Sequence, residues 1–119
     1  MLEEFLGRTK VAPILAKDYV DLSIDVDRMT HGKEIQDSMQ KGRRGGLPWT
    51  IVLDEKGAEL VTSNDANGNN IGAPVQPEEI AHFVEMIRKT KRHMTDEEVR
   101  VVADDLREFA RPRQRPPRR

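Results

Sequence analysis

Apolar residues recur at helical spacing at the start of the chain, but the pattern is interrupted once. Thr9 is placed to act as the N-cap of a second helical piece, and Pro13 falls within the first turns of that piece, where a missing N–H costs least. The spacing therefore predicts a broken amphipathic helix. Its apolar positions are Leu2, Phe5, Leu6, Val11, Ile14 and Leu15.

Residues 19–26 follow a different period, in which apolar and polar side chains alternate. Val20, Leu22, Ile24 and Val26 fall on one face, with polar residues between them. Strict alternation is typical of a strand with one buried face, so a β-strand is predicted here. The next residues are mostly polar, and the apolar positions near residues 35 and 39 predict a helix over 33–41 that faces mainly water.

Two β-rich runs joined by a turn come next. A glycine loop leads through Leu47 and Pro48 into residues 49–53, whose composition favours a strand. Asp54 to Gly57 has turn chemistry, and residues 58–62 supply a second strand. This part of the chain therefore predicts a β-hairpin.

Two amphipathic helices are predicted in the second half. Pro77 opens the first, which has acidic residues in its first turn and ends near residue 92. Thr95 and Glu98 form a capping box for the second, which continues to Ala110 before Pro112. The order of elements predicts an α/β fold with an additional C-terminal helix.

Composition bounds the class of protein. The chain has 119 residues, of which 36% are hydrophobic, so one domain with a modest core is expected. Cysteine is absent, which excludes disulfides, thiolate nucleophiles and metal–sulfur sites in this chain. Because neither a membrane-spanning run nor the apolar core of a secretory signal is found in the sequence, we expect a soluble protein, cytoplasmic by default.

Charge is unevenly distributed. Residues 111–119 hold five of the 20 basic residues and none of the 21 acidic ones, so an acidic body precedes a basic tail. Because prolines interrupt the arginines, the tail is expected to be disordered or polyproline-like. It could contact phosphates or an acidic partner, although a solubilising terminus is the favoured interpretation. Nucleic acid is therefore expected as a partner only through this tail.

The order of these motifs resembles that of thioredoxin-like proteins. The resemblance rests on residues 19–27, 45–57 and 70–74 and covers about residues 1–92. It implies an incomplete thioredoxin-like fold, with helices flanking a mixed sheet. In the family, a strand and a Cys-x-x-Cys motif precede the helix with which this chain begins, and both are absent here.

The resemblance places the missing strand in the middle of the sheet, between residues 19–26 and 49–53. Losing roughly ten ladder hydrogen bonds, at about 0.5–1.5 kcal/mol each, would equal the stability of a typical domain. Three explanations stay open. The chain starts inside a longer protein, which is the explanation that we favour; another chain donates a strand; or the two orphaned edges pair directly.

The candidate site is the segment Gly46, Leu47, Pro48 and Trp49. It looks like the loop that carries the cis-proline of the thioredoxin family, and a cis bond before Pro48 would present the Leu47 backbone to an extended peptide. A trans-proline at the start of a strand is the alternative. Trp49 is expected to pack beneath the loop rather than to line a groove.

Other residue combinations give no site. The three histidines, His31, His82 and His93, are too scattered to bind a metal and are expected to face solvent. The loop at 65–70 resembles the start of a calcium loop, but Asn70 and Gln76 stand where that loop needs glycine and glutamate. We therefore predict no catalytic residue, no cofactor and no metal.

Two functions remain as hypotheses. The first is a thioredoxin-family redox protein represented by its thiol-free portion, which is not catalytic itself, although its full-length relatives would be thiol–disulfide oxidoreductases. The second is a redox-independent module that binds a polypeptide beside Leu47 and Pro48. The predicted organisation is a thioredoxin-like domain at 1–92, an additional helix at 93–110 and a tail at 111–119, with the oligomeric state left open.

Overall fold

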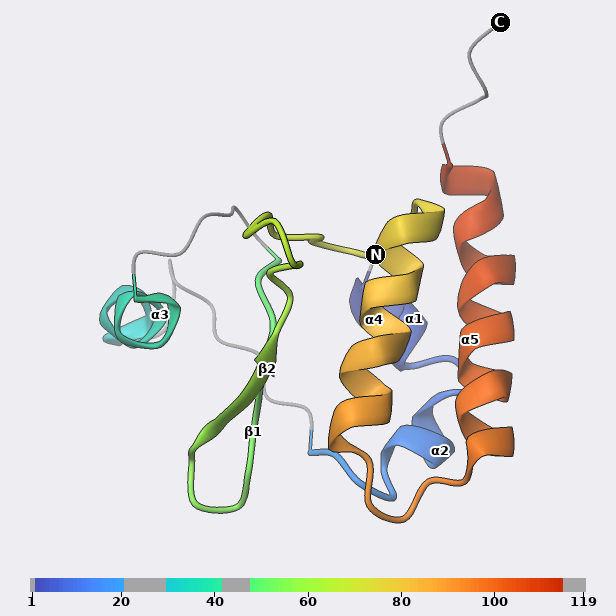
Figure 1. The fold of residues 1–119 in the computed structure, drawn as a ribbon, viewed down its shortest axis with the longest axis horizontal. Coiled ribbons are helices and arrows are strands. Elements are labelled where there is room, and N and C mark those ends of the chain that lie inside the picture. The colour runs from blue at the N-terminus through green and yellow to red at the C-terminus, as the bar shows by residue number, and fades with distance from the viewer. Residues whose placement is uncertain (1, 21–29, 42–47, 115–119) are drawn as a thin grey trace, which may run out of the picture.

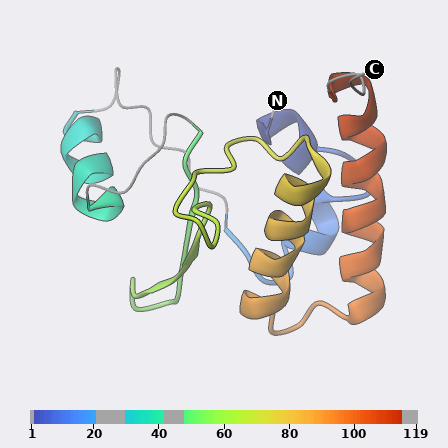
Figure 2. The ribbon, with the colours of Figure 1, turned by 45° about the horizontal axis from the view of Figure 1, so that its top comes forward.

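A computed structural model of the chain describes residues 2–20, 30–41 and 48–114. Two strands form an antiparallel hairpin beside α4, and α3 lies on the far side of that hairpin (Figures 1 and 2). The elements are α1 (Leu2–Leu6), α2 (Ala12–Leu15), α3 (Gly32–Gln40), β1 (Ile51–Leu53), β2 (Glu59–Thr62), α4 (Pro77–Thr90), α5 (Asp96–Ala110) and a 3₁₀ turn (Arg111–Arg113).

The α/β class and the helix at residues 33–41 are confirmed, the latter as α3. The strand predicted at 19–26 lies outside the described residues from Asp21 onward, and Tyr19 and Val20 have no regular structure. Within the described ranges, the sheet has two antiparallel strands. None of the described helices is long and apolar enough to cross a lipid bilayer.

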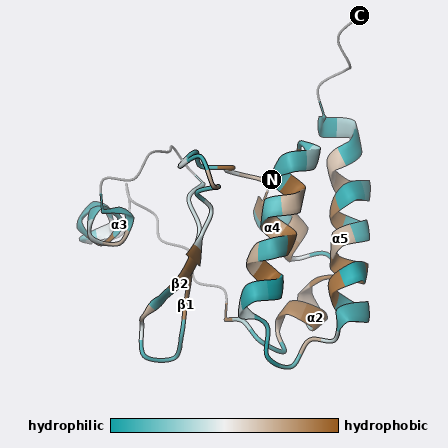
Figure 3. Cartoon of the chain, in the orientation of Figure 1, coloured by the Kyte–Doolittle hydropathy of each residue, from teal (hydrophilic) through white to brown (hydrophobic). Residues whose placement is uncertain are grey.

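The core lies between α4, α5 and the two short N-terminal helices. Figure 3 shows apolar residues on the facing sides of α4 and α5 and polar residues on their outer sides. The additional C-terminal helix therefore shares a core with the N-terminal helices. The buried apolar residues of this core are Phe5, Val11, Ile71, Ile80, Phe83, Val84, Met86, Ile87, Met94, Val99, Val102, Ala103, Leu106, Phe109 and Ala110.

The N-terminal helix is broken as predicted, but Thr9 does not cap its second piece. The N-cap of α2 is Val11, which makes no side-chain capping bond. The reason is that the carbonyl of Arg8 already accepts hydrogen bonds from the amides of Val11 and Ala12, at 3.0 and 2.9 Å. The first amides of α2 are thus paired by a tight turn, and Val11 is free to enter the core.

The predicted hairpin is confirmed. Ile51 pairs with Thr62 and Val52 with Val61, and a bulge follows because Leu53 pairs with Glu59. The turn is held by Asp54, whose Oδ1 accepts hydrogen bonds from the amides of residues 56 and 58, both at 2.8 Å. Gly57 completes it at φ +84°, a conformation that favours glycine.

Both long helices begin at capping boxes. In α5, Thr95 and Glu98 form the predicted reciprocal pair, with the Glu98 amide donating to Thr95 Oγ1 at 3.1 Å. In α4, Gln76 and Glu79 form the corresponding pair before Pro77. These caps satisfy amides that the helices cannot pair internally.

We expect Thr95→Ala to lower the free energy of unfolding by about 1 kcal/mol, because the variant leaves the Glu98 amide without its side-chain acceptor. Urea unfolding followed by circular dichroism measures the change. Thr95→Ser keeps the hydroxyl and is the matched control, so an equal loss in both variants would contradict the capping role.

Asp18 joins the N-terminal segment to the turn between α4 and α5 through hydrogen bonds. The Asp18 carboxylate accepts hydrogen bonds from the backbone amides of Arg92, His93 and Met94 at 2.9–3.0 Å, and from the His93 ring at 2.8 Å. Its side chain is only 2% exposed. Burial raises the pKa of Asp18, but the hydrogen bonds outweigh burial and hold that pKa well below its usual range.

The start of the basic tail is ordered, so the expectation of disorder is wrong for residues 111–114. Arg113 lies 3.9 Å from the centre of the Phe109 ring and donates to the Phe109 carbonyl at 2.7 Å. Gln114 donates to the Val75 carbonyl at 2.9 Å. The chain therefore continues past Pro112 as a 3₁₀ turn. This turn is stabilised by a cation–π contact and by hydrogen bonds to backbone carbonyls.

Candidate functional site

The structure describes half of the predicted site. Gly46 and Leu47, and with them the predicted cis bond before Pro48, lie outside the described residues. Pro48 is exposed and Trp49 is half-buried. The Trp49 indole N–H donates to Asn64 Oδ1 at 2.8 Å, so the tryptophan has a fixed polar anchor.

A partly buried polar network holds the segment that leads into β1. Asn70 Nδ2 donates to the Pro48 carbonyl at 3.0 Å, and Asn70 Oδ1 accepts from the Ser63 hydroxyl at 2.7 Å. The Ser63 hydroxyl in turn accepts from the Thr50 amide at 2.9 Å, and the Ser63 amide donates to the Thr50 carbonyl at 2.8 Å. We call Ser63, Asn64 and Asn70 the brace, since together they bind residues 48, 49 and 50.

Among residues 2–20, 30–41 and 48–114, β2 is the strand that pairs with β1, and it leaves the outer edge of β1 open. The Thr50 carbonyl and the Asp54 amide both bond toward the β2 side of the hairpin. Because backbone groups alternate in direction along a strand, those of Ile51 and Leu53 point to the opposite edge. Within the described part of the chain, these outward N–H and C=O groups have no hydrogen-bond partner.

One face of the hairpin is covered by the core. Val52 and Val61 pack against the core beside α4. His82 of α4 donates a ring N–H to the Thr62 carbonyl at 3.0 Å, which requires that Nε2 carry the proton. The expectation that His82 faces solvent is therefore wrong, because its ring reaches back to the sheet and is half-buried.

Both strands of the hairpin carry an exposed leucine, and Leu53 belongs to the strand with the open edge. Leu53 is 37% exposed and Leu60 is 47% exposed. The turn beyond them carries Asp54 and Glu55, and Glu55 forms an ion pair with Arg92 at 3.1 Å. The edge thus offers backbone hydrogen bonds, an apolar face and an acidic end.

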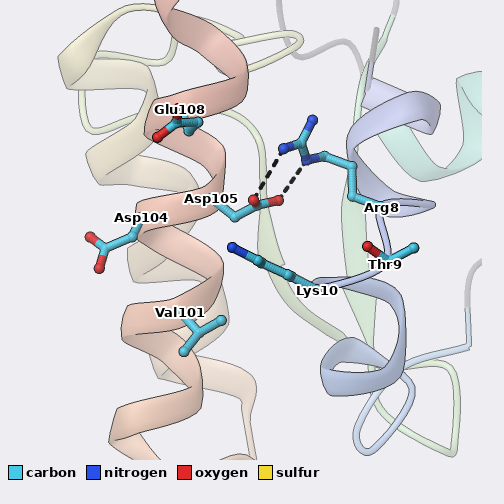
Figure 4. A pocket seen from close by; sticks show the side chains of 7 residues that line it. All are labelled: Arg8, Thr9, Lys10, Val101, Asp104, Asp105 and Glu108. Atoms are coloured by element: carbon cyan, nitrogen blue, oxygen red, sulfur yellow. Dashed lines mark hydrogen bonds and ion pairs between the residues drawn. The ribbon is translucent and has the colours of Figure 1, made fainter.

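A groove of about 760 Å³ lies between the turn at Arg8–Lys10 and α5 (Figure 4). Its inner wall is the ion pair of Arg8 and Asp105, with the two nitrogen–oxygen distances at 2.6 and 3.1 Å. This hydrogen bonding raises the pKa of Arg8. Since the pair joins an N-terminal turn to α5, we interpret it as structural.

Each of the two remaining histidines contacts an acidic side chain. His93 contacts Asp18, and the exposed His31 lies 3.1 Å from Glu34 on the same helix turn. The described residues contain no cluster of three or more side chains that could hold a metal ion. Comparison with protein-family models, with curated proteins and with solved structures found no match to this chain.

The brace is the part of the site that sequence reasoning missed. For the loop at 65–70 the sequence indicates only the start of a calcium loop that lacks the required glycine and glutamate. Two features of that loop could have indicated a structural role: Ser63 directly follows the second strand, and Asn70 begins the last motif of the family resemblance. Side chains of this kind at the end of a hairpin commonly bond to a neighbouring backbone.

Proposed function

We propose that this chain is a redox-independent polypeptide-binding module on a thioredoxin-like scaffold. In this proposal, the outer edge of β1 accepts an extended segment of a partner as an additional strand. The observation that carries the proposal is that the outward N–H and C=O groups of Ile51 and Leu53 have no hydrogen-bond partner among the described residues, next to a segment fixed by the brace.

The absence of cysteine favours binding over thiol exchange. Disulfide exchange needs a thiolate, and this chain has none. The thioredoxin-like resemblance supports the scaffold, because the glycine loop, Pro48 and the strand after it occur in the order that the family uses to hold extended peptides. The predicted groove beside Leu47 and Pro48 and the open edge of β1 adjoin one another in sequence.

The edge defines the chemistry of the partner. Two outward residues, Ile51 and Leu53, offer two donors and two acceptors, so the bound segment must be extended with its own backbone groups free. Apolar side chains at alternate positions of that segment would pack beside Leu53 on the neighbouring strand. A basic residue at one end would lie near the acidic turn at Asp54 and Glu55.

A titration with a designed peptide tests this proposal. The probe is a capped nine-residue peptide that alternates valine and threonine and has a lysine at each end. We expect it to shift the ¹H–¹⁵N signals of Ile51 and Leu53 in the full chain. The same peptide with alternate amides N-methylated is the ligand control, and equal binding of both peptides would contradict strand addition.

Ile51→Pro tests the edge from the side of the protein. Proline removes the outward N–H, which has no partner in the fold, and Ile51 is the first residue of β1, where proline is tolerated. We expect this variant to bind the peptide at least about tenfold more weakly than Ile51→Ala, which keeps the N–H. Equal affinities of the two variants, or signal shifts that depend on protein concentration without peptide, would overturn the proposal.

A further inference from the structure

We infer that Asn70 is a positioning residue that aligns the Pro48–Thr50 segment with β1 and so sets the affinity of the open edge for an extended peptide. The inference rests on the proposed function. Asn70 does not lie on the edge itself, and its effect passes through the backbone of residue 48.

Asn70 bonds to three separate parts of the chain at once. Its Nδ2 donates to the Pro48 carbonyl at 3.0 Å, and its Oδ1 accepts from the Ser63 hydroxyl at 2.7 Å and from the Gly72 amide at 3.0 Å. One side-chain amide therefore joins the segment before β1 to the residue after β2 and to the loop before α4.

The hydroxyl of Ser63 relays this alignment to β1. Ser63 is only 1% exposed, so solvent has little access to replace its hydrogen bonds. Its Oγ accepts from the Thr50 amide while its proton is directed at Asn70 Oδ1. The orientation of Asn70 thus fixes the direction of the backbone immediately before Ile51, the first outward residue of the edge.

Fixing this direction before binding favours peptide capture. A strand that is already extended avoids the entropy loss of ordering its backbone when the partner arrives. Pro48 is exposed and has no backbone N–H, so it cannot anchor the segment through an amide hydrogen bond of its own. The bond from Asn70 supplies the constraint that Pro48 cannot supply for itself.

Asn70→Asp separates the positioning role from a general role in the loop. Aspartate keeps an oxygen that can accept from Ser63 and Gly72, but it replaces the donor to Pro48 with a second acceptor. Asn69→Asp is the matched control. It makes the same change one residue away, at an exposed position whose backbone amide donates to Asp65 Oδ1 and whose carbonyl accepts from the Asp65 amide.

We expect Asn70→Asp to bind the valine–threonine peptide roughly tenfold more weakly than wild type, because the complex dissociates faster. We expect Asn69→Asp to bind the peptide as wild type does. Peptide titrations are made without urea. Circular dichroism verifies beforehand that each variant is fully folded. Amide hydrogen exchange at Thr50 is measured without peptide and should be faster in Asn70→Asp alone.

The outcomes separate the two proposals. If wild type does not bind the peptide, the proposed function fails, whereas faster exchange at Thr50 in Asn70→Asp still supports the alignment of the strand. If wild type binds and Asn70→Asp binds equally well while folded, the inference about Asn70 is overturned and the proposed function stands. Equal losses in Asn69→Asp and Asn70→Asp would also overturn it, because the added charge would then be the cause.

Discussion

Replacing Phe5 with alanine is expected to lower the free energy of unfolding by about 3–5 kcal/mol. Phe5 is fully buried, and its ring centre lies 6.0 Å from that of Phe83 and 5.9 Å from that of Phe109. The substitution would leave a cavity at the point where α1, α4 and α5 meet. Because a domain of this size has a total stability of about 5–15 kcal/mol, the effect is large.

Urea unfolding followed by far-ultraviolet circular dichroism measures this loss. Val101→Ala is the control. Val101 lies on α5, one of the helices around this core, but is 36% exposed, and we expect its free energy of unfolding to change within about 0.5 kcal/mol. Trp49 fluorescence reports on the hairpin in the same samples. A Phe5→Ala variant as stable as Val101→Ala would mean that α1 is not part of the core in solution.

Replacing Asp18 with asparagine is expected to lower the free energy of unfolding by about 2–3 kcal/mol at neutral pH. The carboxylate accepts three backbone amides and one histidine ring N–H, and an asparagine side chain would turn an NH₂ group toward some of these donors. Asp104→Asn is the control, because exposed Asp104 forms an ion pair with Arg107 one turn away on the same helix.

The same residue predicts a dependence on pH. The folded-state pKa of Asp18 is lowered, so its contribution is present above the unfolded-state pKa of about 4 and is lost progressively as the pH falls toward the folded-state value. The stability difference between wild type and Asp18→Asn should therefore narrow as the pH falls from about 5 to 2. A difference that is constant over this range would show that the carboxylate charge is not what holds the turn between α4 and α5.

The sequence predicts elements whose signals are local. The capping box at Thr95, the proline at the start of α4 and the glycine in the hairpin turn each act within a few residues, and the structure contains all three. The sequence also predicts the broken first helix from a local signal, because the apolar spacing stops and resumes. Thr9 is the exception, since the adjacent turn had already paired the amides that it would have capped.

What the sequence could not predict are polar contacts between distant segments. Asp18 meets residues 92–94, and Asn70 meets Pro48, across separations that no periodicity reports. Both side chains look like ordinary surface residues in the sequence. His82 was misplaced in the same way, because its helical position gives its face but not the carbonyl of Thr62 that it reaches.

The unpaired edge of β1 also bears on the behaviour of the chain at high concentration. A strand edge with unpaired backbone N–H and C=O groups and exposed apolar side chains is a usual starting point for aggregation, because another chain can pair with it. Two described features limit that process: β1 has only three residues, and the bulge after Val52 interrupts the flat surface on which a growing fibril would stack. The short strand and its bulge thus allow one peptide strand to be added but disfavour the stacking of many copies into a fibril.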